Sequence, residues 1–421
     1  MYDLTLTPEQ IEFRDTIRDF VTREIKSVAT NATRLQRLRP PFPADLLALI
    51  EPLGLRMLML PTDIEGAGAD TLTACIVLEE LAAGDVDVAM AVSHTALLAQ
   101  WLFGTAMSAE QCAHFLPGYI NSETNEKACH LAHVGGGLDG PGWQYHRQRT
   151  GVQTKRVTAT AQDGGWLLQG DAGFAANADM AGLLVVEAAS NNGVITLLAP
   201  RDTPGLHVRE VATGSDTVVK WHHGAGGYVS FDQCRVPQNN QLQSASAIQP
   251  YLRRGIALRA AVNLGLGRAA FEAAIGYAKL RIQGGRPIIQ HQAIGAKLAD
   301  IAVHLEAARN LIWKAAWSLD HPEADAQNGY TGMPLETAAR VFTAETVRSA
   351  TENATECFGA MGVMLDMPLQ KYVHDAVIFL HSGVSDTVDK FEIASGRVCP
   401  CRSLARTSSC PVLPSICVDR D

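Results

Sequence analysis

The first thirty residues show apolar positions at helical spacing. The apolar face consists of Phe13, Ile17, Phe20 and Val21. The segment before it, Thr7-Pro8-Glu9-Gln10, offers a capping hydroxyl, a first-turn proline and a capping-box glutamine in the preferred order. This pattern predicts an amphipathic helix that begins at Pro8. Similar periodicity predicts helices over residues 44–50, 72–83 and 109–120.

The pattern changes after Cys129. Short apolar runs, separated by Gly, Asn, Asp and Pro, occur at residues 166–168, 183–188, 194–199 and 228–231. Runs of this length between turn residues are typical of β-strands. Helical periodicity returns from Leu252 to about Ala394, with long segments at residues 257–280, 293–319 and 335–358. The chain is therefore expected to fold as helices, then strands, then helices.

Composition limits the class of protein. The chain has 421 residues, 47% of them hydrophobic, and a formal net charge of -9 without a basic block. These values fit a large buried core and argue against nucleic acid or an anionic membrane surface as the partner. The apolar stretch 46–60 is interrupted and too short to cross a bilayer, and the first nine residues lack the pattern of a signal or transit peptide. We therefore expect a cytoplasmic protein without a membrane span.

The cysteines and histidines do not predict a metal site. Five cysteines lie singly in apolar stretches, and the other four crowd residues 396–421 with a spacing that matches no zinc pattern. That Cys-rich tail is predicted to be disordered or to come from a foreign reading frame. His222 and His223 would point to opposite faces of a strand, and neither they nor His133 have a complementary Cys or carboxylate set.

Several segments resemble the acyl-CoA dehydrogenase family, over roughly residues 5–395. The most specific runs from Tyr277-Ala278-Lys279 through residues 281–288 to His291-Gln292. Residues 358–362, Phe-Gly-Ala-Met-Gly, are similar to a Phe-Gly-Gly turn of the family, and His374-Asp375-Ala376 resembles its Arg-Asp-Ala. The resemblance implies an α+β fold. Its expected parts are an N-terminal all-α domain (1–128), a middle β-barrel-like domain (129–245) and a C-terminal four-helix bundle (246–395).

The resemblance also implies FAD as the cofactor. In the family, the segment at Arg281 reaches across a dimer interface to the neighbouring subunit's FAD, where a planar, permanently charged guanidinium suits the pyrophosphate. The cofactor-binding residues that it implies are Arg281, Gln283, Gln292, Phe358, Gly359, Ala132, Phe174 and Ala176. Two departures stand out here: Gly284 replaces an aromatic residue, and Glu356 replaces a neutral Gln.

The residues expected to serve the chain's own flavin and its chemistry are replaced. Ala132 and Ala176 stand where hydroxyl contacts to the isoalloxazine are usual. The family's catalytic Glu, which removes the proton α to the thioester carbonyl, falls on Gly383, and the alternative position for that base falls on Gly255. Arg253 and Arg254 are candidate substrate-binding residues near Gly255.

Two titratable side chains lie close to the empty base position. They are His381, a weak candidate base whose ordinary basicity suits neutral pH, and Asp386, three residues beyond Gly383. A packing histidine and a solvated loop carboxylate are the preferred interpretations of these two residues.

Residues that would serve the chain's own flavin and base are replaced, whereas those that would reach into a neighbour's site are mostly kept. This difference suggests a heteromer. The first hypothesis is an acyl-CoA dehydrogenase-type oxidoreductase, acting on CH–CH bonds of an acyl-CoA in lipid or aromatic acid catabolism. In it, this chain is a base-deficient subunit of a homo- or hetero-tetramer with a paralogous subunit. FAD is then shared with or held mainly by that partner, and an electron-transfer flavoprotein is the expected redox partner. The alternatives are a flavin-dependent monooxygenase or lyase-like acyl-CoA enzyme, and a non-catalytic scaffold.

Overall fold

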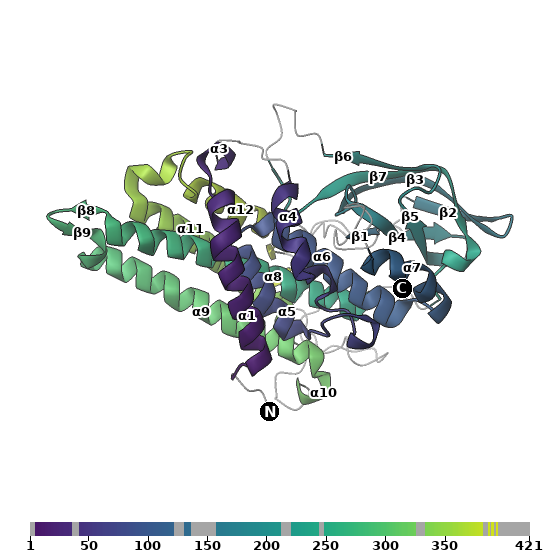
Figure 1. The fold of residues 1–421 in the computed structure, drawn as a ribbon, viewed down its shortest axis with the longest axis horizontal. Coiled ribbons are helices and arrows are strands. Elements are labelled where there is room, and N and C mark those ends of the chain that lie inside the picture. The colour runs from purple at the N-terminus through teal and green to yellow at the C-terminus, as the bar shows by residue number, and fades with distance from the viewer. Residues whose placement is uncertain are drawn as a thin grey trace, which may run out of the picture.

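Helices form one part of the molecule and a β-sheet forms the other (Figure 1). The structure is a computed structural model, and it describes residues 5–35, 42–121, 130–135, 157–211, 220–243, 248–325 and 333–381, with 386–387, 389–390 and 393–394. The predicted α+β architecture, helices before and after a central sheet, is confirmed.

The first N-terminal helix begins at Pro8, where the sequence predicts it. Thr7 caps the first helix, and Thr7 and Gln10 form both hydrogen bonds of a capping box. The helices are α1 (Pro8–Phe20), α2 (Lys26–Ala29), α3 (Ala32–Leu35), α4 (Ala44–Ile50), α5 (Thr71–Ala82), α6 (Val86–Trp101) and α7 (Ala109–Ile120). Two π-helical turns, Val21–Ile25 and Leu102–Ala106, continue α1 and α6, and single 3₁₀ turns lie at Glu51–Leu53, Leu55–Met57 and Thr62–Ile64.

Helix α6 is the longest helix that the hydrophobic pattern did not predict. Nearly all of its residues are buried, so its sequence lacks the polar face that periodicity detects. Val86–Ala106 is long and apolar enough to cross a membrane by length and composition, but 89% of its apolar window is buried inside the molecule. A core helix of a soluble domain has the same properties.

Within the described residues, seven strands form the central sheet. They are β1 (His130–Val134), β2 (Val157–Gln162), β3 (Gly165–Ala176), β4 (Ala181–Ser190), β5 (Gly193–Pro200), β6 (Leu206–Glu210) and β7 (Gly226–Pro237). Their order is β1-β4-β2-β3-β7-β6, with β5 paired to β4. A 3₁₀ turn at Gln238–Asn240 follows β7. Along β1, Ala132 and Val134 enter the core of the sheet domain, whereas Leu131 faces the helical core. One face of β1 therefore lies at the boundary with the helices.

The C-terminal region is built on long helices. Its elements are α8 (Ile248–Leu280), β8 (Ile282–Gln283), β9 (Arg286–Pro287), a 3₁₀ turn (Ile288–Gln290), α9 (Gln292–Asp320), α10 (Pro322–Asp325), α11 (Leu335–Phe358), a 3₁₀ segment (Gly359–Val363) and α12 (Leu369–His381). Helices α8, α9 and α11 pack against one another, and α12 packs on α8 and α11. The hairpin β8–β9 projects from the end of this bundle that lies far from the sheet (Figure 1).

Candidate functional site

The hairpin at residues 280–287, called the arm below, is exposed at the tip of the bundle. Leu280 is 83% exposed and Ile282 is 65% exposed, which is unusual for apolar side chains of this size. The Arg281 side chain is also exposed, and no hydrogen bond or ion pair engages it within the described part of the chain. The arm therefore presents a free guanidinium beside apolar side chains, as an intermolecular contact would require.

Two glycines fix the shape of the arm. Gly284 and Gly285 lie between the paired residues Gln283 and Arg286 and have φ values of 62° and 77°. A two-residue hairpin turn with both central residues at positive φ strongly favours glycine. The turn thus explains why Gly284 stands where the family resemblance predicts an aromatic residue.

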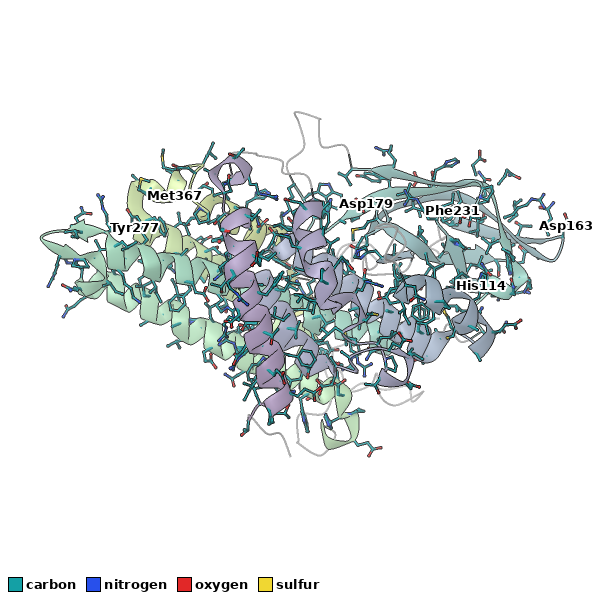
Figure 2. The ribbon with its side chains drawn as sticks, in the orientation of Figure 1. His114, Asp163, Asp179, Phe231, Tyr277 and Met367 are labelled. Carbon is teal, nitrogen blue, oxygen red and sulfur yellow. The ribbon has the colours of Figure 1, made fainter. Side chains whose placement is uncertain are left out.

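The other residues predicted to contact a cofactor from this end lie nearby. The His291 Nε2 atom is 3.0 Å from the Gln283 carbonyl oxygen, and Gln292 is the exposed first residue of α9. The Phe358 ring stacks on the Tyr277 ring, with centroids 4.1 Å apart (Figure 2 labels Tyr277 at this end). The structure thus brings together the predicted residues at the end of α8, the start of α9 and the end of α11.

The turn at the end of α11 is open and its nearby carboxylate is paired. Gly359 has φ 56°, and a Cβ atom added there would meet nothing within 4 Å. Lys297 donates to the Glu356 carboxylate over 2.5 Å and to Asn353 over 3.0 Å. Glu356 therefore does not present an unbalanced negative charge beside the open turn.

The alternative base position lies near the other end of α8. Gly255 faces α6, where a Cβ atom added to it would approach the Leu97 Cδ2 atom to 3.3 Å. From Gly255 to Leu280, the last residue of α8, is 25 residues, which at a rise of about 1.5 Å per residue corresponds to about 38 Å along the helix; Arg281 follows directly. The two predicted groups of site residues within one chain are therefore well separated.

Both predicted substrate-binding arginines form ion pairs within the chain. Arg253 donates to both carboxylate oxygens of Glu336, over 2.5 and 3.2 Å. Arg254 donates to the Asp320 carboxylate over 3.3 Å and to the Thr71 hydroxyl over 3.1 Å. These contacts join α8 to α11, α9 and α5. Both arginines therefore stabilise the packing of these helices.

The predicted flavin face of the sheet is filled by aromatic side chains. Ala132 is buried, and Ala176 pairs with Gly226 at the end of β3. The Phe174 ring lies 4.7 Å from the Trp221 ring and 4.6 Å from the His222 ring, measured between centroids. Aromatic packing therefore takes the place of the polar contacts that the family resemblance predicts at this face.

Two titratable residues flank the main predicted base position, Gly383. Gly383 lies outside the described residues, between His381, at the exposed end of α12, and Asp386. The Asp386 carboxylate lies 3.0 Å from an Arg340 guanidinium nitrogen, and partial burial raises the pKa of Asp386 even though Arg340 opposes this effect. Asp386 is thus a paired carboxylate rather than a solvated one.

A buried cluster of charged side chains lies where the N-terminal helices, the sheet region and α12 meet. The sequence analysis did not predict it. This junction cluster contains Asp85, Asp87, Lys220, His223, Lys371 and Asp375. Lys220 lies 2.7 Å from the Asp87 carboxylate and 3.0 Å from the Asp375 carboxylate. Lys371 lies four residues before Asp375 and 2.7 Å from its carboxylate, but Lys220 is 155 residues away, so the sequence showed Asp375 only as part of a family motif.

The described ranges contain no group of three or more side chains arranged for a metal ion. His223 stacks on the Phe379 ring, with centroids 4.2 Å apart, and burial lowers its pKa. The nearest carboxylate to His133 is that of Glu187, with 3.4 Å between His133 Nε2 and Glu187 Oε1. These histidines are packing residues or members of pairs.

Comparison with known proteins gives consistent matches. Sequence models of the acyl-CoA dehydrogenase N-terminal and C-terminal domains match residues 7–123 and 247–382. Benzylmalonyl-CoA dehydrogenase of Aromatoleum aromaticum is 29% identical over 411 residues, covering 93% of this chain and 98% of that protein.

Solved structures match the whole fold. The butyryl-CoA dehydrogenase of Megasphaera elsdenii has a TM-score of 0.76 at 22% identity, covering 94% of this chain and 100% of that one. A glutaryl-CoA dehydrogenase of Mycobacterium smegmatis in complex with FADH2 has a TM-score of 0.75 at 20% identity, covering 93% and 94%.

Proposed function

The chain belongs to the acyl-CoA dehydrogenase family, and we propose that within it the protein is the base-deficient subunit of a heteromeric oxidoreductase that acts on an acyl-CoA thioester. Its arm would complete the FAD site of a paralogous subunit that carries the catalytic carboxylate. The paralogue would supply the base that this chain lacks at Gly383 and Gly255.

The observation that carries this proposal is the distance between the two ends of α8. In this family's reaction, a proton and a hydride leave adjacent carbons of one substrate, so base and flavin must both lie close to it. Gly255 lies about 38 Å along α8 from Leu280, and Arg281 follows Leu280 directly. An arm at that distance, exposed and free of partners within the described residues, is suited to a site on another subunit.

The residues at the tip of the bundle fit a flavin dinucleotide. Arg281 offers a permanent charge and a planar set of donors for a pyrophosphate. Gly359 leaves open space where the backbone could approach the cofactor, and the pairing of Glu356 with Lys297 removes a repulsion. When bound, FAD supplies the acceptor for the substrate's β-hydride; this chain's contribution would be to position it.

The chain's own flavin face fits a cofactor less well. Phe174 is covered by Trp221 and His222, and neither Ala132 nor Ala176 offers a hydroxyl donor. The absence of a positioned base alone would cost roughly a hundred- to ten-thousand-fold in rate. We therefore expect dehydrogenation to occur at the partner's site, with an electron-transfer flavoprotein as the acceptor and the complex in the cytoplasm.

Co-expression with the paralogues of the same genome tests the assembly. Native mass spectrometry should find a hetero-oligomer with a Glu-bearing paralogue, and its visible spectrum should show about one flavin for every two chains. Recovery of a homomer with one tightly bound FAD per chain would refute the proposal.

A pair of variants tests the arm. Arg281→Gln should lower the flavin content of the purified complex. Arg235→Gln changes an exposed arginine of β7 whose nearest carboxylate, that of Asp163, is 3.7 Å away, and it should leave the flavin content unchanged. Equal flavin retention by the two variants would show that the arm does not hold the cofactor.

A further inference from the structure

The contact between α6 and α8 contains buried polar atoms without partners. The two helices run antiparallel here, so that residues of α6 lie opposite residues of α8 in reverse order. The α6 residues are His94, Leu97 and Trp101, and the α8 residues opposite them are Arg259, Gly255 and Tyr251. Leu97 is the nearest neighbour of Gly255, and the Trp101 and Tyr251 rings lie 5.6 Å apart between centroids. We call this contact, together with the adjacent His133 of β1, the seam.

Two nitrogen atoms in the seam lack a hydrogen-bond partner among the described residues. They are His94 Nδ1 and Trp101 Nε1. Trp101 is only 5% exposed. The His133 Nε2 atom is not among them, because it lies 3.4 Å from the Glu187 carboxylate. Buried polar atoms are nearly always hydrogen-bonded, because an unpaired one loses its bonds to water without replacement. Two such atoms on one contact indicate that something else binds there.

The chemistry of these atoms defines what would bind. An indole nitrogen can only donate a hydrogen bond. Burial, with a smaller contribution from the Arg259 charge, lowers the pKa of His94 to about 4, so its ring is neutral at pH 7 and can donate through only one nitrogen. The aromatic rings of Trp101, Tyr251 and His133 provide an apolar wall beside the Trp101 donor. The matching ligand is apolar along its length and carries a hydrogen-bond acceptor.

The location identifies the ligand. Gly255 occupies the position of the alternative base in the family resemblance, and a base at that position has to reach the α-carbon of the thioester. A ligand beside Gly255 would therefore be the acyl group. From the unpaired atoms and this location, and resting on the proposed acyl-CoA function, we infer that the seam binds acyl groups that carry a hydrogen-bond acceptor in preference to plain alkyl chains.

Matched thioesters test this preference. Binding of hexanoyl-CoA and 5-oxohexanoyl-CoA to the purified native complex would be measured by calorimetry, because the two ligands have the same chain length and differ in one carbonyl acceptor. We expect the oxo compound to bind about ten-fold more tightly, as for a ligand that pairs a donor otherwise left unsatisfied.

Substitutions assign the effect to the seam. Trp101→Phe keeps an aromatic ring and removes the donor, so it should bring the affinity ratio close to one; His94→Leu should reduce the ratio as a second variant. Trp166→Phe is the matched control, because the Trp166 indole donates to Gln241 over 3.1 Å in the sheet domain. Thermal unfolding of each variant would confirm that it folds.

The outcomes separate the two proposals. Equal affinities for the two thioesters would overturn the inference and show that water satisfies the buried atoms, while the proposed acyl-CoA function would stand. A preference that survives in both Trp101→Phe and His94→Leu would also overturn it, because the acceptor would then bind elsewhere. If neither thioester binds, the inference and the acyl-CoA function both fail.

Discussion

Replacing Lys220 by Met should destabilise the protein strongly. The Lys220 ammonium group lies 2.7 Å from Asp87 and 3.0 Å from Asp375, whose side chains are 7% and 1% exposed. The substitution keeps most of the side-chain volume but leaves two buried carboxylates with only Lys371 as a nearby cation. Breaking a buried ion pair by removing one partner typically costs about 3–5 kcal/mol. This is a large part of the roughly 5–15 kcal/mol by which a protein is stable.

The measurement is a urea unfolding curve followed by circular dichroism, with a matched exposed pair as control. Lys390 pairs with Glu345, and both side chains are about half exposed. Lys390→Met should therefore cost less than about 1 kcal/mol. Adding Asp87→Asn to Lys220→Met should recover part of the loss, because it removes one of the unpaired charges. A midpoint for Lys220→Met no lower than that for Lys390→Met would refute the reasoning.

The same cluster predicts a pH dependence. Burial alone would raise the pKa of Asp375, but the charges of Lys220 and Lys371 outweigh it and lower this pKa to about 2. Because the folded-state pKa lies below the unfolded value of about 4, the stabilisation is present above pH 4 and is lost as the pH falls toward 2. Lys220→Met should weaken this dependence, as unfolding midpoints between pH 2 and pH 4 would show; an unchanged slope would contradict the assignment.

Three further substitutions have defined outcomes. Gly265→Ala would place a Cβ atom 2.4 Å from the Glu79 carbonyl oxygen and should cost about 1–3 kcal/mol in urea unfolding, whereas Gly276→Ala, with nothing within 4 Å, should stabilise α8 by up to about 1 kcal/mol. Arg254→Met should lower the unfolding midpoint and leave acyl-CoA affinity unchanged; weaker binding at an unchanged midpoint would instead support a substrate contact. Gly284→Ala should distort the arm at φ 62° and lower the flavin content of the complex without changing the unfolding midpoint, and full flavin retention would contradict this.

Local signals in the sequence predicted local structure well. The bounds of α4, α7 and α11 match the predicted segments, since each has a clear start signal or a polar face. Helix α6 was missed because burial on all sides removes the periodicity on which the prediction depends. Short, weakly apolar strands such as β2 and β6 were missed as well, because their pairing partners rather than their own residues define them.

The candidate site was harder to predict because its contacts are long-range. Arg254 bonds to Thr71, 183 residues away, and Lys220 to Asp375, 155 residues away. A single sequence carries no signal for such pairs, so Arg253 and Arg254 looked available for a substrate although each has an ionic partner. The arm differs because its shape follows from neighbouring residues, above all the two glycines of its turn.

The two ends of α8 differ in a way that explains why family residues are kept in the arm and replaced near Gly255. Near Gly255, both neighbouring arginines form ion pairs with other helices, which stabilises this chain's own fold. At the other end, Arg281 and the apolar side chains of the arm remain exposed, and folding of this chain alone gains little from them. Exposed apolar side chains beside an unpaired guanidinium are stabilised only when another molecule covers them. The residues retained in the arm are therefore those that a partner's site would need. The residues replaced near Gly255 are those that a chain without its own base does not need.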